Sequence, residues 1–275
     1  MITVALGAAR KNGITYFFFP QWEKYKFINH GFSSRSGGVS KGPFASLNLG
    51  YSGGDVPGAV NENRRRFLEI FGQKLDSLVC GEQVHGTRVH LVEKSFYFAS
   101  KDQGRVIPAT DALITAEPGV VLGALSADCL ISFFLDPVTP AIGLAHAGWR
   151  GTCSGILAGV VKSMCRFFGS KAEQLEVFMA PCIGGSCYEV GGEVLDFCAG
   201  SLWVEDIVFL PGKTPDHPFL DLQKTNFNIL KRMGIQPGKI YGNKCCTCCN
   251  QHLFYSYRGI KGRSTGRQMG IIFLR

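Results

Sequence analysis

Short apolar runs separated by turn-forming residues dominate this sequence and constrain its fold most strongly. The 275 residues include 35 glycines and 12 prolines, and pairs such as Pro118-Gly119 and Asp136-Pro137 separate successive runs. Apolar runs bounded by such residues are typical of β-strands. The predicted strands are residues 78–84, 88–92, 112–125, 130–135, 141–146, 175–179, 253–257 and 270–274.

Helical periodicity appears between these runs. Residues 59–71 interleave charged with apolar side chains, and residues 151–168 place apolar side chains three or four positions apart, so both predict helices. Residues 192–198 and 221–233 are further candidates, and Asp221 can cap the latter. Strands and helices without strict βαβ alternation favour an α+β fold, with mixed sheets flanked by helices in one domain over residues 1–275.

The composition limits the setting of the protein. The apolar run 120–135 is interrupted by Asp128, whereas a membrane span needs about 20 predominantly apolar residues, so we expect no membrane partner. The N-terminal segment lacks a basic region before its apolar stretch, which favours the cytoplasm and reduced states for the 11 cysteines. The net charge of +8 is scattered, so small anions are expected as partners rather than nucleic acid.

Three polar residues at predicted strand ends offer metal-binding donors. They are His85, Cys129 and His146. Imidazole and thiolate are preferred zinc ligands, and three protein ligands with an open fourth position are the usual catalytic arrangement. Taken one at a time, each residue also fits a structural role, as a turn histidine, a core thiol and a core histidine.

Specific motifs along almost the whole chain resemble the bacterial YfiH-like family. Members of that family have been labelled polyphenol oxidase or laccase-like, and are also described as purine nucleoside phosphorylases with adenosine deaminase activity. The motifs include Gly31-Phe32-Ser33-Ser34-Arg35, Ser46-Leu47-Asn48-Leu49-Gly50, Gln83-Val84-His85-Gly86, Thr110-Asp111-Ala112, Ala127-Asp128-Cys129, His146-Ala147-Gly148-Trp149-Arg150-Gly151, Cys187-Tyr188-Glu189-Val190 and Thr265-Gly266-Arg267.

The resemblance implies a function and a set of site residues. It implies a zinc-dependent phosphorylase that cleaves purine nucleosides with phosphate, with adenosine deaminase and methylthioadenosine phosphorylase activities as extensions. His85, Cys129 and His146 correspond to the metal ligands and catalytic centre, and Asn48 and Arg64 to further active-site residues. Copper is the alternative metal, because it exceeds zinc in raw affinity.

Individual roles follow from side-chain chemistry. Arg64 is the first candidate for binding phosphate, since guanidinium pairs with it through two hydrogen bonds, and Arg150 is a weaker candidate that could form a structural ion pair. Asp128 could orient a ligand or carry a proton. The structural alternatives are a turn aspartate for Asp128, an Asx turn for Asn48 and a solvated helix face for Arg64.

Three rival interpretations remain open from the sequence. Cys129 and His146 could form the nucleophile and base of a cysteine hydrolase. A laccase-like copper oxidase is disfavoured, because six histidines are too few for several copper centres. Cys245, Cys246, Cys248 and Cys249 could form a separate structural zinc site, although adjacent cysteines cannot all reach one ion easily.

Overall fold

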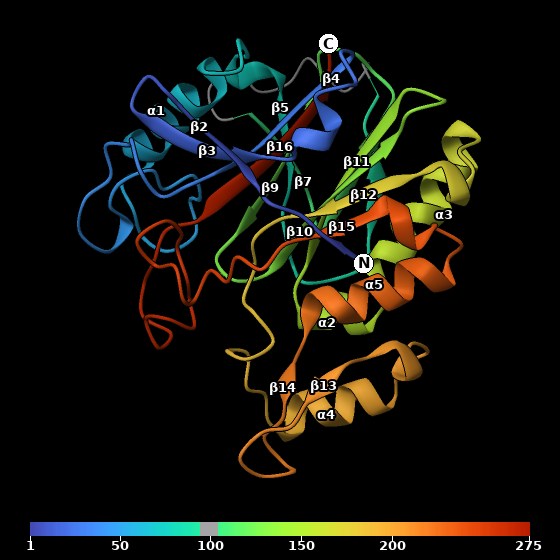
Figure 1. Cartoon of the computed structure of the whole chain (residues 1–275). Helices are drawn as coiled ribbons and strands as arrows, with labels where there is room; N and C mark the ends of the chain where they lie inside the picture. The colour runs from blue at the N-terminus through green and yellow to red at the C-terminus, as the bar shows by residue number, and fades with distance from the viewer. Residues whose placement is uncertain (94–103) are drawn as a thin grey trace.

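Two seven-stranded mixed sheets pack face to face in the computed structural model, which describes residues 1–93 and 104–275 (Figure 1). The first sheet runs in the order β1 (Ile2–Thr3), β15 (Ile240–Gly242), β12 (Glu176–Met179), β10 (Leu130–Asp136), β11 (Ala141–Ala147), β8 (Ala112–Thr115) and β6 (Val89–Leu91). The second runs β2 (Gly7–Lys11), β3 (Ile14–Phe18), β4 (Ile28–Ser33), β16 (Gln268–Leu274), β9 (Val121–Ser126), β5 (Leu78–Gly81) and β7 (Arg105–Ile107).

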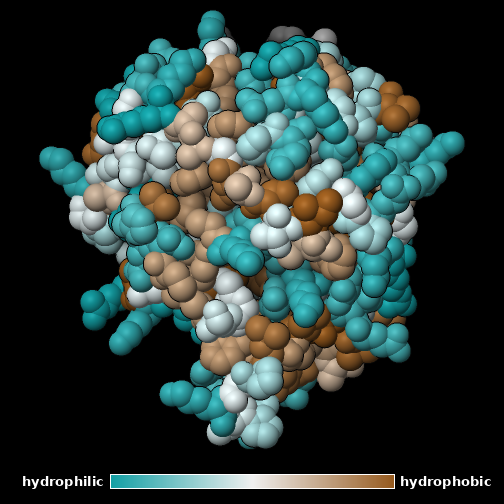
Figure 2. All heavy atoms as spheres, in the orientation of Figure 1, coloured by the Kyte–Doolittle hydropathy of each residue, from teal (hydrophilic) through white to brown (hydrophobic). Residues whose placement is uncertain are grey.

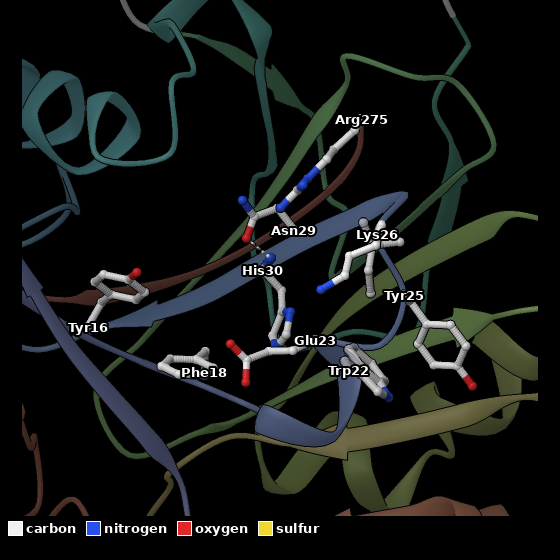
Figure 3. Close-up of a pocket in the computed structure, with 10 residues that line it drawn as sticks. Tyr16, Phe18, Trp22, Glu23, Tyr25, Lys26, Asn29, His30 and Arg275 are labelled. Atoms are coloured by element: carbon white, nitrogen blue, oxygen red, sulfur yellow. Dashed lines mark hydrogen bonds between the residues drawn. The ribbon is translucent and has the colours of Figure 1, made fainter.

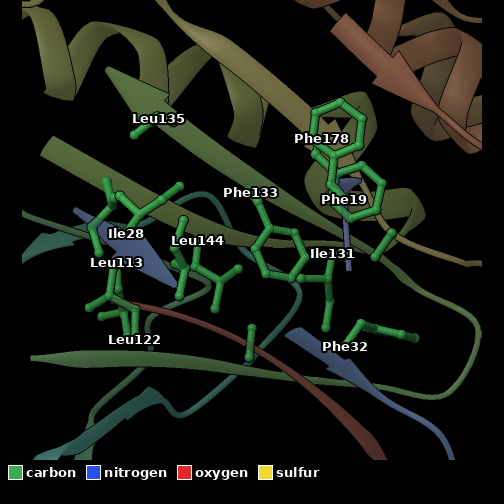
Figure 4. Close-up of a cluster of buried hydrophobic side chains, with 14 of the residues drawn as sticks. Phe19, Ile28, Phe32, Leu113, Leu122, Ile131, Phe133, Leu135, Leu144 and Phe178 are labelled. Carbon is green, nitrogen blue, oxygen red and sulfur yellow. The ribbon is translucent and has the colours of Figure 1, made fainter. Parts of the chain in front are cut away.

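Alternating side chains on the strands build the layers between and outside the sheets. In β10, Ile131, Phe133 and Leu135 enter the core between the two sheets, which Figure 4 shows. On the opposite face of the same strand, Leu130 and Phe134 pack towards the helical layer. Successive residues of a strand point to opposite faces, so one apolar strand supplies two core layers at once.

Helices cover the outer face of each sheet. On the first sheet lie α3 (Ile156–Phe168) and α5 (Leu222–Arg232), and on the second lies α1 (Pro57–Glu69). The other α-helices of the described residues are α2 (Trp149–Cys153) and α4 (Gly192–Ala199), and short 3-10 turns lie at Pro20–Trp22, Gly42–Phe44, Leu75–Ser77, Ala172–Gln174, Val204–Asp206 and Pro237–Lys239. The α+β prediction, with mixed sheets flanked by helices, is therefore confirmed.

Most predicted elements are confirmed, with three corrections. Asp221 caps α5, as expected, because its carboxylate accepts a hydrogen bond from the Lys224 amide at 2.9 Å. The predicted strand 112–125 is two strands, β8 and β9, and the predicted helix 151–168 is broken into α2 and α3 at Gly155, where φ is +78°. The predicted strand 253–257 is irregular backbone.

A small lobe lies beyond the first sheet, at the bottom of Figure 1. It contains α4 and the hairpin of β13 (Phe209–Leu210) and β14 (Phe219–Leu220). Cys153 of α2 and Cys198 of α4 form a disulfide, so the prediction of reduced thiols is wrong for this pair. Both thiols lie in one apolar cluster, and their Cα atoms are 5.7 Å apart, within the range that a disulfide spans.

Hydrophilic and hydrophobic residues are interspersed on the face of the molecule that Figure 2 shows. Within residues 1–93 and 104–275, no helix is both long and apolar enough to cross a membrane.

Candidate active site with a metal-binding donor set

The three predicted donors, His85, Cys129 and His146, come together at one end of the sandwich. Their ligand atoms all lie within 4.8 Å of one another, and His85 Nε2 is 3.9 Å from Cys129 Sγ. A tetrahedral zinc ion with bonds of about 2.0 to 2.3 Å separates its nitrogen and sulfur ligands by about 3.6 Å. The donor chemistry and the spacing therefore fit a transition-metal ion.

Strand ends bring these donors to the same place. His85 lies in the loop after β5, His146 near the end of β11, and Cys129 in the short connection from β9 to β10. Because β9 belongs to the second sheet and β10 to the first, the chain crosses between the sheets at Cys129. The site consequently receives donors from both sheets.

Asp111 holds two of the donors in place through hydrogen bonds to the His85 loop and to the ring of His146. Its carboxylate accepts hydrogen bonds from the backbone amides of Val84, His85 and Gly86, at 3.1, 3.0 and 2.8 Å, and lies 2.9 Å from His146 Nδ1. Burial opposes ionisation, but the hydrogen bonds from His146 and Gly86 outweigh it and lower the pKa of Asp111. With Nδ1 held by a carboxylate, Nε2 of His146 is left to bind a metal ion, as in carboxylate–histidine–metal arrangements.

Charge stabilisation makes Cys129 and His146 a thiolate–imidazolium pair in the absence of metal. Burial alone would raise the pKa of the Cys129 thiol, but His146 and His85 lower it to about 6. Burial alone would lower the pKa of His146, but Cys129 and Asp111 raise it to about 9. Since metal binding needs thiolate and neutral imidazole, this pair already supplies the ionised sulfur.

Two strained positions and one close approach shape the site. His85 and Asp128 have φ values of +61° and +97°, a region that side chains other than glycine seldom adopt. A Cβ atom on Gly148 would lie 2.8 Å from His85 Cδ2 and 3.1 Å from Cys129 Sγ. Glycine is required there because the backbone passes directly beside two donors.

A cavity of about 650 Å³ opens over the donors, a size suited to a small organic ligand. Apolar and aromatic residues share its lining with four arginines, which are Arg64, Arg150, Arg258 and Arg267. Burial lowers the pKa of Arg267, although an arginine stays charged at neutral pH. An anionic ligand is therefore well matched to this cavity.

Arg64 lines the cavity, whereas Asn48 lies outside its lining. The Arg64 side chain is 2% exposed, donates to the Leu49 carbonyl at 2.8 Å and lies over the Tyr51 ring at 4.3 Å. Asn48 accepts hydrogen bonds from the amides of Gly50 and Arg267, at 3.0 and 2.8 Å. The bond to Gly50 is the Asx turn considered above, so Asn48 positions Arg267 rather than facing the cavity.

The two weaker candidates differ in their partners. Arg150 lines the cavity but pairs with Glu193 and stacks on Trp149, which matches the structural ion pair considered for it. The Asp128 carboxylate accepts hydrogen bonds from Thr247 Oγ1 at 2.6 Å and from the Arg258 amide at 2.7 Å. Through these two hydrogen bonds, Asp128 links the β9–β10 connection, on which Cys129 also lies, to the C-terminal segment.

Sequence reasoning missed Asp111, Tyr188 and Arg267 as individual site residues. Each occurs in a motif that carries the family resemblance, and that was the available signal. Tyr188 and Arg267 line the cavity, while Asp111 reaches the donors through hydrogen bonds made across 25 to 35 residues of sequence. Such long-range pairings leave no local pattern.

A second, smaller cavity of about 190 Å³ lies away from these donors, at His30 (Figure 3). His30 points between Phe18 and Trp22 in that view, and its Nε2 accepts a hydrogen bond from the Phe19 amide at 2.9 Å. Burial lowers the pKa of His30 to about 4. His30 is consequently a neutral core histidine.

The predicted four-cysteine site does not form as expected. Cys246 and Cys249 approach Cys187 instead, and the cluster of three excludes Cys245 and Cys248. The physical reason is that Cys245 packs against the core between the sheets, whereas Cys246 and Cys248 pack against the apolar cluster that contains Cys153 and Cys198. None of these cysteines lines the cavity above His85, Cys129 and His146.

Comparisons with known proteins extend over nearly the whole chain. Residues 29–275 match the family described as multi-copper polyphenol oxidoreductase laccase. Purine nucleoside phosphorylase YlmD of Geobacillus stearothermophilus is 37% identical over 243 residues, covering 88% of each chain. Purine nucleoside phosphorylase PA4543 of Pseudomonas aeruginosa is 35% identical over 256 residues, covering 93% of this chain and 97% of the relative.

Solved structures agree in fold. The crystal structure of Bacillus licheniformis hypothetical protein YfiH matches with a TM-score of 0.87 and 31% identity, covering 96% of this chain and 97% of that one. The crystal structure of YlmD from Geobacillus stearothermophilus matches with a TM-score of 0.83 and 34% identity, covering 97% and 98%.

Proposed function

Because the chain belongs to the YfiH-like family described as multi-copper polyphenol oxidoreductase laccase, we propose that it is a zinc-dependent purine nucleoside phosphorylase. Its substrates would be nucleosides of the adenosine, inosine and guanosine type, and its products a free base and ribose 1-phosphate. One observation carries the proposal: an open His–Cys–His donor set lies in an arginine-lined cavity of about 650 Å³.

Phosphate binding would fall to the buried arginines. In phosphorolysis a phosphate oxygen forms a bond to the sugar C1′ while the bond from C1′ to the base breaks, and the base leaves with the electron pair. Arg64 and Arg267 can hold the phosphate dianion at the cavity wall, because the burial of Arg64 and the partial burial of Arg267 strengthen charge-assisted hydrogen bonds. The Leu49 carbonyl accepts a hydrogen bond from the Arg64 guanidinium, and the carbonyls of Thr265 and Gly266 accept hydrogen bonds from that of Arg267.

The metal ion would be held by His85 Nε2, Cys129 Sγ and His146 Nε2, with Asp111 fixing the ring of His146. When bound, zinc would supply a Lewis acid that stabilises negative charge developing on the substrate. The protein residues would align the nucleoside above the donors and exclude bulk water from the cavity. Tyr188 and Tyr257 line that cavity and offer aromatic surface to a purine.

Adenosine deaminase and methylthioadenosine phosphorylase activities are proposed as further reactions of the same cavity. Deamination needs the purine amine rather than the sugar C1′ to face the donors, so the two reactions would use different substrate orientations. The proposed setting is the cytoplasm, in a single domain over residues 1–275.

Product analysis tests the proposal. Zinc-loaded protein is incubated with inosine or adenosine, with and without phosphate, and the products are separated. Phosphate-dependent release of free base supports the phosphorylase, and phosphate-independent conversion of adenosine to inosine supports the deaminase. If no purine nucleoside releases base in the presence of phosphate, the phosphorylase assignment is overturned.

A matched pair of arginine variants tests the phosphate role. Arg64→Gln should raise the KM for phosphate about 10- to 100-fold, since a hydrogen bond to a charged group contributes about 1.5 to 3 kcal/mol. Arg66→Gln is the control, because Arg66 lies on the same helix but pairs with Glu62 and is absent from the cavity lining. An equal effect of both variants would contradict the assignment.

A cysteine hydrolase is the second candidate, favoured by the low pKa of Cys129 beside His146 and Asp111. Metal removal separates the two functions. Loss of activity on chelation, with recovery on adding Zn²⁺, supports the metal enzyme. Full activity of metal-free protein, abolished by alkylating Cys129, would support the hydrolase instead. Reconstitution with Cu²⁺ followed by a phenol-oxidation assay tests the laccase alternative.

A further inference from the structure

A second group of sulfur donors lies outside the proposed active site. Cys187, Cys246 and Cys249 have Sγ atoms that all lie within 4.8 Å of one another, and the Sγ atoms of Cys187 and Cys249 are 3.3 Å apart. Three thiolates around a tetrahedral zinc ion, each bonded at about 2.3 Å, would lie about 3.8 Å apart. The 3.3 Å distance between Cys187 and Cys249 is about 0.5 Å below that value and exceeds the bond length of about 2.05 Å in a disulfide.

Backbone hydrogen bonds hold the two segments that carry these cysteines. The Cys187 amide donates to the Gly184 carbonyl at 2.9 Å, which closes a turn, and the Asn250 amide donates to the Cys246 carbonyl at 3.0 Å. A β-bridge between Cys182 and Cys246 joins the segments. The cluster is therefore assembled by the fold rather than by chance contact of flexible side chains.

One sulfur atom also has the kind of partner that metal-bound thiolates have. The Gly184 amide donates a hydrogen bond to Cys246 Sγ at 3.1 Å. Hydrogen bonds to ligand atoms orient them and tune a metal site.

We propose that Cys187, Cys246 and Cys249 bind a second Zn²⁺ ion, with the fourth coordination position open to solvent at the exposed Cys249. Thiolates select soft or borderline ions over magnesium or calcium, which prefer oxygen ligands. No oxidant is needed, since binding only displaces protons from the three thiols. The inference is independent of the proposed phosphorylase activity.

The position of this ion gives it a structural role next to the cavity. Tyr188, which lines the cavity, directly follows Cys187. Thr247, which follows Cys246, donates to the carboxylate of Asp128, the neighbour of Cys129. An ion that joins residues 187, 246 and 249 would therefore fix two segments that form one wall of the active site.

Zinc counting tests the proposal on purified full-length protein. Wild-type protein should hold two Zn²⁺ per chain. Cys249→Ser should hold one, and it should fold because Cys249 is exposed. Cys245→Ser is the matched control and should hold two, since Cys245 belongs to the same segment but packs against the core between the sheets. An unchanged zinc content in Cys249→Ser would overturn the proposal.

A second pair of measurements keeps the two metal sites distinguishable. The double variant His85→Ala/Cys129→Ser should retain one Zn²⁺, and Co²⁺ bound to it should show thiolate-to-cobalt charge-transfer absorption. If only the thiolate site exists, wild type should hold one ion and Cys249→Ser none. Mass spectrometry that finds a Cys187–Cys249 disulfide and no bound metal in protein purified without oxygen would also overturn the proposal.

Discussion

Asp111 determines the geometry of the site at the scale of single residues. Its two carboxylate oxygens receive three backbone amides from residues 84–86 and face one ring nitrogen of His146. An amide side chain would present an N–H group where a second oxygen is needed. The loop that carries His85 and the ring of His146 both depend on this one acceptor.

Asp111→Asn should therefore weaken zinc binding by about 10- to 100-fold, the usual effect of removing a partner of a metal-bound histidine. Competition with a chelator of known affinity measures the change. Asp136→Asn is the control, because Asp136 is likewise a buried carboxylate but lies at the end of β10 away from Cys129. Equal zinc affinities in Asp111→Asn and wild type would show that Asp111 does not orient His146.

The backbone of His85 gives a second prediction at this scale. With φ at +61°, glycine at position 85 is unstrained, whereas alanine costs about 1 kcal/mol. Both His85→Gly and His85→Ala remove the same donor. In urea unfolding of metal-free protein, His85→Gly should be the more stable by about 1 kcal/mol, and equal stabilities would contradict a left-handed conformation in this loop.

His30 should make stability depend on pH. Its pKa is lowered to about 4 in the folded protein, against about 6.5 when unfolded, so the unfolded chain binds more protons between these values. The contribution of neutral His30 to the unfolding free energy is therefore complete above pH 6.5, and the unfolding free energy falls by about 3 kcal/mol as the pH is lowered to 4. His30→Gln keeps an acceptor for the Phe19 amide, and its unfolding free energy should fall less over this range. Parallel pH curves would contradict the assignment.

At the scale of elements, the break between α2 and α3 rests on one glycine. A Cβ atom on Gly155 would lie 2.1 Å from Trp203 Nε1, and its φ of +78° already disfavours other residues. Gly159, inside α3, has φ outside that region, and an added Cβ would meet only ordinary contacts from 3.4 Å. The two glycines of one helical region thus have opposite roles.

Gly155→Ala should destabilise the protein by about 2 to 4 kcal/mol through steric overlap and strain. Gly159→Ala should be neutral or stabilise it by up to about 1 kcal/mol, since alanine is the better helix former. Denaturant unfolding of both variants measures the difference. Equal effects would mean that α3 starts elsewhere.

At the scale of the whole molecule, the sequence predicted those strands and helices whose formation is decided by local patterns. Strands β10, β11 and β12 follow apolar runs with clear ends, and Asp221 marks the start of α5. Residues 253–257 have the composition of a strand, but the Tyr255 amide bonds to the Gln268 side chain instead of a neighbouring strand. Pairing partners are set by the whole fold, so composition alone could not exclude a strand there.

The same distinction applies to the site. Motifs identified His85, Cys129 and His146, and the structure brings all three together. The role of Asp111, the placement of Asn48 behind Arg267 and the approach of Cys187 to Cys249 depend on contacts between distant segments. The family resemblance therefore identified which residues belong to the site, whereas the contacts among them depend on the packing of the two sheets.

The crossing of the chain between the sheets at Cys129 has a mechanical consequence. One donor follows a strand of the second sheet, one ends a strand of the first, and the third lies on the link between them. An ion bound there would cross-link the two sheets, because the sheets could not separate at that end without breaking its bonds to the donors. Affinity for the ion then adds directly to the cohesion of the fold.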